Sequence, residues 1–268
     1  MWTGWSLYQM SNIKRRATEI IKSLFLAISL LALNQQIYAA THMVQLPLSQ
    51  KKEITQMQNS LSEQQQAIIP IAAYAANGDL AKLSQSLKDG LDLGLTIAEI
   101  KEVLVQTYAY AGFPRSLNAL TTFMQVLEQR KESGIRDIEG KTNSTLPKDY
   151  QALLQGTQNQ TQLVGQPVKG ALFEFAPAID EYLKAHLFGD IFSRDVLNWQ
   201  DREIATLSML SALEGVDSQL QSHLNIAKTQ GVSSHQFENI QKILAEKVSL
   251  QVGQRFQNVL TSFHNQSL

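Results

Sequence analysis

Apolar residues recur at three- and four-residue spacing along most of the chain, the pattern of helices that bury one face. Residues 97–111 and 117–127 both show this pattern, yet no polar loop separates them. Between them lies Gly112-Phe113-Pro114. A glycine accepts the left-handed backbone at a helix end, and a proline fits the first turn of the next helix. The sequence therefore predicts two helices joined by a sharp elbow.

A longer helical pattern occurs twice. The stretch from Leu61 aligns with the stretch from Leu197, and Gly94 aligns with Gly231 once a single residue is inserted into the second copy. In each copy the pattern predicts a helix, a turn, a second helix ended by the glycine, and a third helix with a hydroxyl cap. The capping residues are Thr96 and Ser233. The sequence thus predicts an all-α fold built from two similar helical domains.

The predicted domains occupy residues 55–132 and 171–266. Residues 133–170 between them are rich in Gln, Thr, Gly and Lys and show weak periodicity. We therefore expect a linker there, with one short helix around residues 148–156. Residues 173–197 are expected to form a helix packed ahead of the second copy.

The first forty residues have the order of a secretory signal peptide. Basic residues precede an apolar run at 23–33, and small residues follow it. The run is shorter than the roughly 20 residues of a membrane-spanning helix, and an uncleaved anchor is the alternative. We expect residues 1–40 to be a signal peptide, with Met1 or Met10 as the start. The body would then be exported to the periplasm and would meet the membrane only through this segment.

Composition narrows the classes of function. The chain has 23 basic and 24 acidic residues and a formal net charge of -1, so no basic surface for nucleic acid is predicted. It has no cysteine, which excludes disulfides, thiolate metal sites and thiol catalysis. The histidines show no metal-ligand spacing and no phosphate-binding loop is present. We therefore expect neither a metal nor another cofactor.

Two segments resemble parts of a known family. Residues 95–120 (LTIAEIKEVLVQTYAYAGFPRSLNAL) resemble the C-terminal part of a carboxymuconolactone decarboxylase domain. Residues 188–240, which begin FGDIFSRDVLNWQDREIATL, resemble the N-terminal part of another. The resemblance implies tandem all-helical domains that assemble into rings of subunits. It also implies a relationship to the alkyl hydroperoxidase D branch of the same superfamily.

That branch uses a glutamate, a CxxC pair and a histidine. By the resemblance, Glu203 matches the glutamate and His223 the histidine, which makes them the candidate catalytic residues. Val216 and Gln219 stand at the cysteine positions. The peroxidase and disulfide-reductase chemistry of that branch is therefore contradicted by the residues, and a peroxiredoxin-type antioxidant activity, the least favoured alternative, would require a cysteine from a partner.

The helical pattern places Glu203 within the apolar arc of its helix. A buried glutamate needs a partner or a raised pKa, and such a group in a cleft is a candidate acid or base. The alternative is that Glu203 belongs to an acidic first turn capped by Asn198 and favours the helix dipole.

His223 lies beside the apolar stripe of a helix that Asp217 is expected to cap. A histidine in this position is either a hydrogen-bonded core residue or a catalyst. The first copy has Ala67 and Ser86 at the positions of Glu203 and His223. At most one of the two copies can therefore work through such a pair.

The elbow suggests a site for an anion. Phe113 is a poor N-cap, so the amides near Arg115 and Ser116 are expected to lack side-chain partners, and free amides at a helix N-terminus favour an anion. No elbow is expected in the second copy. The alternative is that the elbow only turns the chain and that Asn118 is a surface residue.

Arg194 matches an arginine of the family. It would either hold a substrate carboxylate through two hydrogen bonds or pair with Asp190 or Asp195. The candidate substrate-binding residues are Tyr110, Phe113, Pro114, Arg115, Asn118 and Arg194.

These features together predict an exported, cofactor-free decarboxylase or proton-transfer enzyme that acts on a small carboxylated lactone or related acid. The elbow would hold an anionic group while Glu203 and His223 move a proton. We expect a homo-oligomer, as the family resemblance implies. The alternative is a non-catalytic helical binding or assembly module in which the site has decayed.

Overall fold

The computed structural model describes residues 60–266, so the signal peptide predicted for residues 1–40 lies outside the described part. Eleven α-helices and two π-helical segments make up the ordered elements of this part, which contains no strand. The predicted all-α fold is confirmed. None of the described helices combines the length and the apolar character that crossing a membrane requires.

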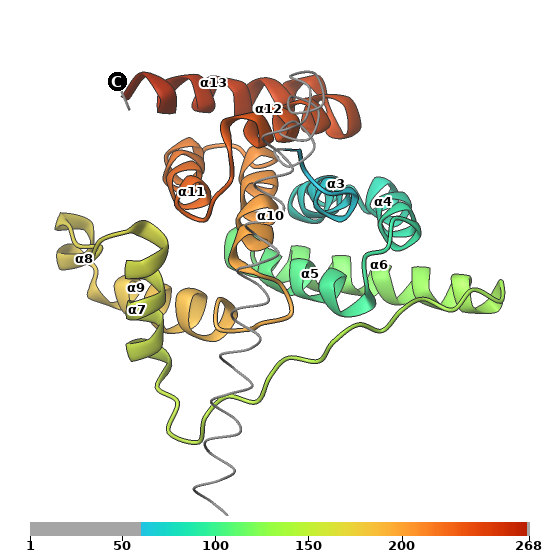
Figure 1. Cartoon of the computed structure of the whole chain (residues 1–268), viewed down its shortest axis with the longest axis horizontal. Coiled ribbons are helices and arrows are strands. Elements are labelled where there is room, and N and C mark those ends of the chain that lie inside the picture. The colour runs from blue at the N-terminus through green and yellow to red at the C-terminus, as the bar shows by residue number, and fades with distance from the viewer. Residues whose placement is uncertain (1–59, 267–268) are drawn as a thin grey trace, which may run out of the picture. The chain divides into compact units, whose positions relative to one another are not determined.

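Eight of the α-helices form two groups of four (Figure 1). The first group consists of α3 (Glu63–Asn77), α4 (Leu80–Asp92), α5 (Ile97–Ala111) and α6 (Phe113–Glu132). The second consists of α10 (Trp199–Ser211), α11 (Asp217–Thr229), α12 (Ser234–Ile243) with its π-helical continuation η2 (Leu244–Val248), and α13 (Leu250–Gln266).

The second group repeats the helix order of the first. The starts of α11, α12 and α13 follow those of α4, α5 and α6 by one common offset, which is a single residue larger than the offset from α3 to α10. The insertion inferred from the sequence thus lies between the first and second helices of the second group. "Equivalent" residues below are those related by these offsets, so that Ala67 is equivalent to Glu203 and Ser86 to His223.

The helix ends follow the local sequence closely. Thr96 and Ser233 both form capping boxes, in which the hydroxyl accepts from the third helical amide and a Glu or Gln side chain returns to the cap. Gly94 and Gly231 adopt positive φ angles of 91° and 89°, which glycine tolerates best. One prediction was wrong. Asp217 is the first residue of α11, and Val216 precedes it as an N-cap without a side-chain hydrogen bond.

The elbow is present where the sequence predicts it. Gly112 ends α5 and precedes α6, with φ 82°, and Ser116 ties the helices together by donating to the Leu104 carbonyl at 2.7 Å. The expectation that the second copy has no such break was wrong. The helix breaks at the equivalent Ser249, whose hydroxyl accepts from the Val252 amide at 3.2 Å, so a serine cap replaces the glycine and proline.

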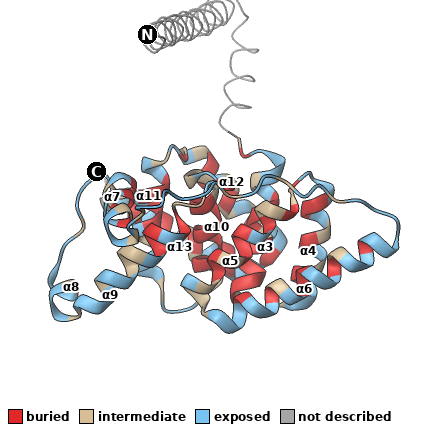
Figure 2. Cartoon of the chain, turned by 90° about the horizontal axis from the view of Figure 1, so that it is seen from below, coloured by how far each residue is buried: buried red, intermediate tan, exposed pale blue. Residues whose placement is uncertain are grey.

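The two groups pack through their first helices. Helices α3 and α10 lie side by side at the centre (Figure 1), and both are buried along most of their length (Figure 2). Gln65 of α3 donates to Asp201 of α10 at 2.9 Å, and these two residues are equivalent. Contact between equivalent positions is expected close to a twofold axis. Helix α10 also packs on α5, and α3 packs on the equivalent α12 and η2, so the contacts between the groups are reciprocal, as in an approximate twofold arrangement.

The segment expected to be a linker contains a packed helix. Helix α7 (Ala152–Val164) extends beyond the predicted short helix and packs on the π-helical segment η1 (Leu183–Ile191). A Cβ on Gly156 would lie 1.7 Å from the Lys184 carbonyl oxygen, so glycine allows the close approach. The contact combines this close backbone approach with a small apolar cluster, in which Leu163 packs with Leu187, Phe188 and Ile191. The weak periodicity of the segment did not reveal it.

The helix expected over residues 173–197 is divided. It consists of α8 (Ala171–Phe175), α9 (Pro177–Tyr182) and η1. Helices α8 and α9 have no buried residue and lie at the edge of the described part (Figure 2). Pro177 begins α9, consistent with the restriction that proline places on the preceding residue.

Candidate active site

Glu203 and His223 meet in the interior. Glu203 is the fifth residue of α10 and is 0% exposed, while His223 of α11 is 8% exposed. The His223 Nδ1 atom lies 2.8 Å from Glu203 Oε2. Asn198 caps α10 as expected and accepts from the Asp201 amide at 2.8 Å, but the acid in the first turn is Asp201, and Glu203 lies beyond that turn. Glu203 and His223 form a buried hydrogen-bonded pair.

Tyr110, at the last turn of α5, reaches this pair from the other helical group. Its ring meets the His223 imidazole edge-on, with 5.5 Å between the centroids. Burial raises the pKa of the Tyr110 phenol, and the nearby Glu203 carboxylate raises it further. The hydroxyl therefore stays protonated. Although Thr206 lies beside it, the hydroxyl makes no hydrogen bond of good geometry, and Glu203 Oε1 also lacks a partner among the described residues.

A buried glutamine connects α5 to α10. Gln106 of α5 donates from Nε2 to the Arg202 carbonyl at 3.0 Å and to the Thr206 hydroxyl at 2.8 Å. Its Oε1 accepts from Arg202 Nη1 at 3.0 Å. All polar atoms of the Gln106 side chain are thus used, which fixes α5 against α10 and sets the position of Tyr110.

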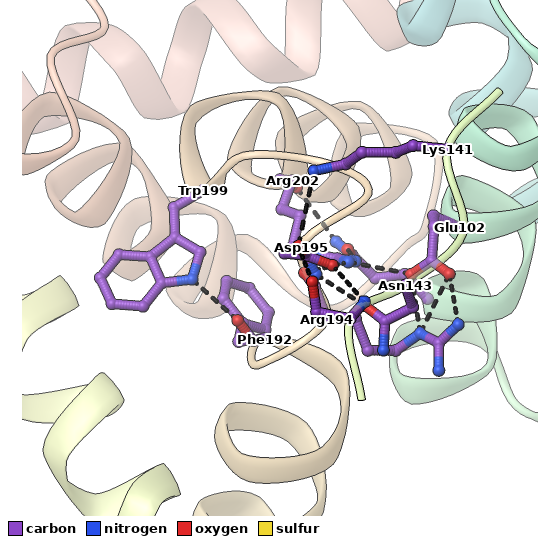
Figure 3. A network of polar contacts seen from close by, with 10 residues as sticks. Glu102, Lys141, Asn143, Phe192, Arg194, Asp195, Trp199 and Arg202 are labelled. Atoms are coloured by element: carbon purple, nitrogen blue, oxygen red, sulfur yellow. Dashed lines mark hydrogen bonds and ion pairs between the residues drawn. The ribbon is translucent and has the colours of Figure 1, made fainter. Parts of the chain in front are cut away.

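Arg202 belongs to a buried charge cluster that sequence reasoning missed (Figure 3). Its guanidinium is fully buried and donates from Nη2 to Glu102 Oε2 at 2.9 Å. Arg194 binds the same carboxylate from Nε and Nη2, with 2.6 Å between Nη2 and Oε1. Burial raises the pKa of Glu102, but hydrogen bonds and charge from both arginines outweigh it, so the net pKa is lowered.

The partner of Arg194 is therefore Glu102 and neither of the two acids that the sequence suggested. Neither expected acid takes this role, since Asp190 lies 2.7 Å from His186 and Asp195 accepts from the amide and hydroxyl of Ser144. Burial lowers the pKa of Arg202, and its hydrogen bond and ion pair with Glu102 oppose that effect. Arg194 therefore binds the buried Glu102 carboxylate through two of its guanidinium nitrogens.

A cavity of about 730 Å³ adjoins this cluster. Its walls come from the segment between η1 and α10, the start of α10, α7 and the segment before α7, and they include Lys141, Tyr150, Asn159, Arg194, Trp199 and Asp201. The Trp199 indole donates to the Phe192 carbonyl at 2.9 Å, which fixes one wall (Figure 3). Neither Glu203 nor His223 lines this cavity.

The elbow residues lie elsewhere. Phe113 is exposed and stacks on Tyr108 with 4.4 Å between ring centroids, and Pro114 and Asn118 are also exposed. The Arg115 guanidinium packs over Gly78 at the carboxyl end of α3. The residue of the first group that contacts the Glu203–His223 pair is therefore Tyr110, just before the elbow.

Within residues 60–266, no group of three or more His, Cys, Asp or Glu side chains is arranged to bind a metal ion.

Comparison with known proteins supports part of the family resemblance. A stretch of 66 residues is 32% identical to the uncharacterized protein MJ1511 of Methanocaldococcus jannaschii. The aligned stretch makes up 25% of this chain and 62% of that protein. The chain thus spans about three fifths of the length of this curated relative. The model of the carboxymuconolactone decarboxylase family matches residues 49–123, which include α3, α4, α5 and the elbow. Residues 49–123 are therefore similar in sequence to the carboxymuconolactone decarboxylase family.

Proposed function

We propose that the protein catalyses a cofactor-free proton transfer, with decarboxylation of a small carboxylated lactone or related acid as the reaction. The observation that carries the proposal is the 2.8 Å contact between His223 Nδ1 and Glu203 Oε2 in the interior. A carboxylate on one ring nitrogen orients the imidazole and leaves the other nitrogen, Nε2, for a substrate. The family domain in residues 49–123 supports the reaction class.

The proposed reaction breaks the bond between the substrate carboxylate and its neighbouring carbon. Carbon dioxide leaves, and the electron pair of that bond moves into an adjacent carbonyl to give an enolate. His223, protonated at Nε2, transfers its proton to the carbon, and the imidazole regains a proton from solvent. Tyr110 has a raised pKa, so its neutral hydroxyl can donate to the enolate oxygen.

Release of carbon dioxide from a panel of lactones and β-keto acids tests this proposal. His223→Ala and Glu203→Gln should each lower kcat/KM by about 100-fold or more, the usual contribution of a general acid or base. His235→Ala is the matched control, because the His235 side chain on α12 is partly exposed and lies 3.4 Å from Glu238. Equal turnover by all four proteins would remove Glu203 and His223 from the mechanism.

One observation favours a second candidate, a non-catalytic helical binding or assembly module. The family match falls on the copy that has Ala67 and Ser86 at the positions of Glu203 and His223. Glu203 is also completely enclosed. Under this alternative the pair stabilises the fold only, and the folded wild-type protein turns over none of the panel.

We also propose that the protein is exported and forms a homo-oligomer. Export rests on the signal-like order of residues 1–40, and fractionation of expressing cells tests it. Assembly is supported by exposed apolar side chains on one face of α6, at Phe113, Leu117 and Met124. Light scattering after size exclusion should give a multimer for the wild type and a smaller species for Leu117→Glu. A monomeric wild type would refute assembly.

A further inference from the structure

The twofold relation between the helical groups places a second site opposite the Glu203–His223 pair. That pair lies where the first two helices of the second group, α10 and α11, meet α5 of the first. The equivalent place lies where α3 and α4 meet the end of α12 and η2. It contains a cavity of about 370 Å³, here named the Ser86 cavity.

Residue size distinguishes these two places. In the second group the place is filled by Glu203, His223 and the ring of Tyr110. The equivalent residues are Ala67, Ser86 and Lys247, and all three line the Ser86 cavity. Alanine and serine are much smaller than glutamate and histidine, and the flexible Lys247 side chain is exposed rather than packed inside. The substitutions thus leave a space where the other copy has a buried pair.

The wall of the Ser86 cavity has an apolar part. Ala67 and Pro70 come from α3, Leu93 follows α4, and Ile243 ends α12. The Tyr74 ring adds to this surface, and its hydroxyl donates to the Lys247 carbonyl at 2.5 Å, which joins α3 to η2. Such a wall suits the apolar body of a small molecule, and the volume lies at the lower end of the roughly 300–1,000 Å³ of ligand sites.

The charged part of the wall consists of Lys82, Lys247 and Asp89. Lys82 also forms an ion pair with Asp79 at 3.4 Å. Asp89 already accepts a hydrogen bond from Gln85 at 2.7 Å. The Lys82 ammonium lies 5.5 Å from the centre of the Tyr74 ring, at the cavity wall. Lys247 has no acidic partner within 4.0 Å among the described residues, so its charge is available to a ligand.

We infer that the Ser86 cavity binds a small carboxylate with an apolar body, the carboxylate facing Lys247 and Lys82 and the body facing Ala67, Pro70 and Ile243. This site is separate from the Glu203–His223 pair and does not depend on the function proposed for that pair. In the full chain the two equivalent places would then have different roles, since one holds an acid–base pair and the other holds a ligand.

Calorimetric titration of the full chain with octanoate tests the inference, with 1-octanol as the uncharged probe. Octanoate should bind at one site and 1-octanol at least about tenfold more weakly, because it lacks the charge that the lysines recognise. Lys247→Gln should weaken octanoate binding about tenfold. Lys242→Gln is the matched control, since Lys242 is exposed on α12, lies 3.9 Å from Glu246 and does not line the cavity.

Two further variants locate the site. Ser86→Phe should fill the cavity and abolish octanoate binding, and its circular dichroism melting curve shows whether the variant is folded. His223→Ala should leave octanoate binding unchanged, which separates the Ser86 cavity from the Glu203–His223 pair. No binding by the wild type at millimolar octanoate, equal binding of 1-octanol, or full affinity in Lys247→Gln would overturn the inference.

Discussion

Gln65 donates a hydrogen bond at 2.9 Å to Asp201, the residue that occupies its own position in the second helical group. The contact lies where the two groups meet through α3 and α10, and it has a consequence for the sites. Each equivalent place is built from two helices of one group and one of the other. Neither group therefore contains a complete site, and Tyr110 of the first group completes the surroundings of His223 in the second.

The buried Glu203–His223 pair should show strong energetic coupling. His223→Leu leaves the Glu203 carboxylate enclosed without its partner, so we expect a loss of about 3–5 kcal/mol in the free energy of unfolding. Replacing both residues by leucine removes the uncompensated group and should recover most of that loss. Urea unfolding of the wild type, both single variants and the double variant measures the coupling.

The control for that cycle is the exposed pair of His235 and Glu238, which lies on one helix at 3.4 Å. Its coupling should be about 0.2–1 kcal/mol, typical of surface pairs. If the losses in Glu203→Leu and His223→Leu simply add in the double variant, the interaction between these two side chains contributes nothing to stability.

Local sequence predicted the helix ends better than the charge cluster. Thr96, Ser233 and Gly112 act through neighbours in the chain, so their roles could be inferred without the fold. Glu102 and Arg202 lie far apart in the sequence, and charged residues are usually exposed. One indication of burial was present, because α10 has apolar, small and hydroxyl residues on all sides in its second half.

The sequence identified candidate functional residues, but it did not reveal which of them meet in the fold. The family resemblance identified Glu203 and His223, and their meeting is a long-range result of packing that the structure supplies. Of the predicted substrate-binding residues near the elbow, Tyr110 contacts His223, while Arg115 packs over Gly78. The direction of a side chain at a helix end depends on the neighbouring helix, which one sequence does not reveal.

Tyr110→Phe should make the protein more resistant to alkali. Burial and the Glu203 charge raise the pKa of Tyr110 in the folded state above its ordinary value of 10.0. The unfolded chain therefore releases this proton first, so stability is complete below about pH 10 and falls as the pH rises further. Tyr110→Phe has no phenol to ionise, so its free energy of unfolding does not fall for this reason. Urea unfolding between about pH 9 and about pH 11 compares the slopes.

Tyr182→Phe serves as the control because the Tyr182 side chain is exposed. It should keep the alkaline slope of the wild type. The same slope in Tyr110→Phe would show that the phenol ionises alike in the folded and unfolded states, contrary to its burial beside Glu203.

Glu102→Gln should destabilise the protein, most clearly near neutral pH. The fully buried Arg202 guanidinium loses the carboxylate that compensates its charge, at an expected cost of about 3–5 kcal/mol. Because the pKa of Glu102 is lowered in the folded state, its contribution is present above the ordinary value of 4.5 and is lost as the pH falls below it. The difference between wild type and variant should therefore shrink in acid.

Unfolding curves at neutral and acidic pH measure this difference. Glu139→Gln is the matched control, since Glu139 forms an exposed ion pair with Lys101 at 3.4 Å and should contribute less than about 1 kcal/mol. A cost for Glu102→Gln no larger than that of Glu139→Gln would contradict a compensating role for the buried carboxylate.

Gly156→Ala should detach α7 from η1. The added Cβ would lie 1.7 Å from the Lys184 carbonyl oxygen and 2.6 Å from the Gly189 amide nitrogen, and both are backbone atoms that cannot rotate away. The helices must move apart, so we expect a loss of at least about 1–3 kcal/mol, typical of overpacking. Hydrogen exchange should show weaker protection in α7 and η1 than in α3 and α10. Gly170→Ala, where a Cβ meets no atom within 4 Å, should leave both stability and exchange unchanged, and equal behaviour of the two variants would show that α7 does not need this close approach.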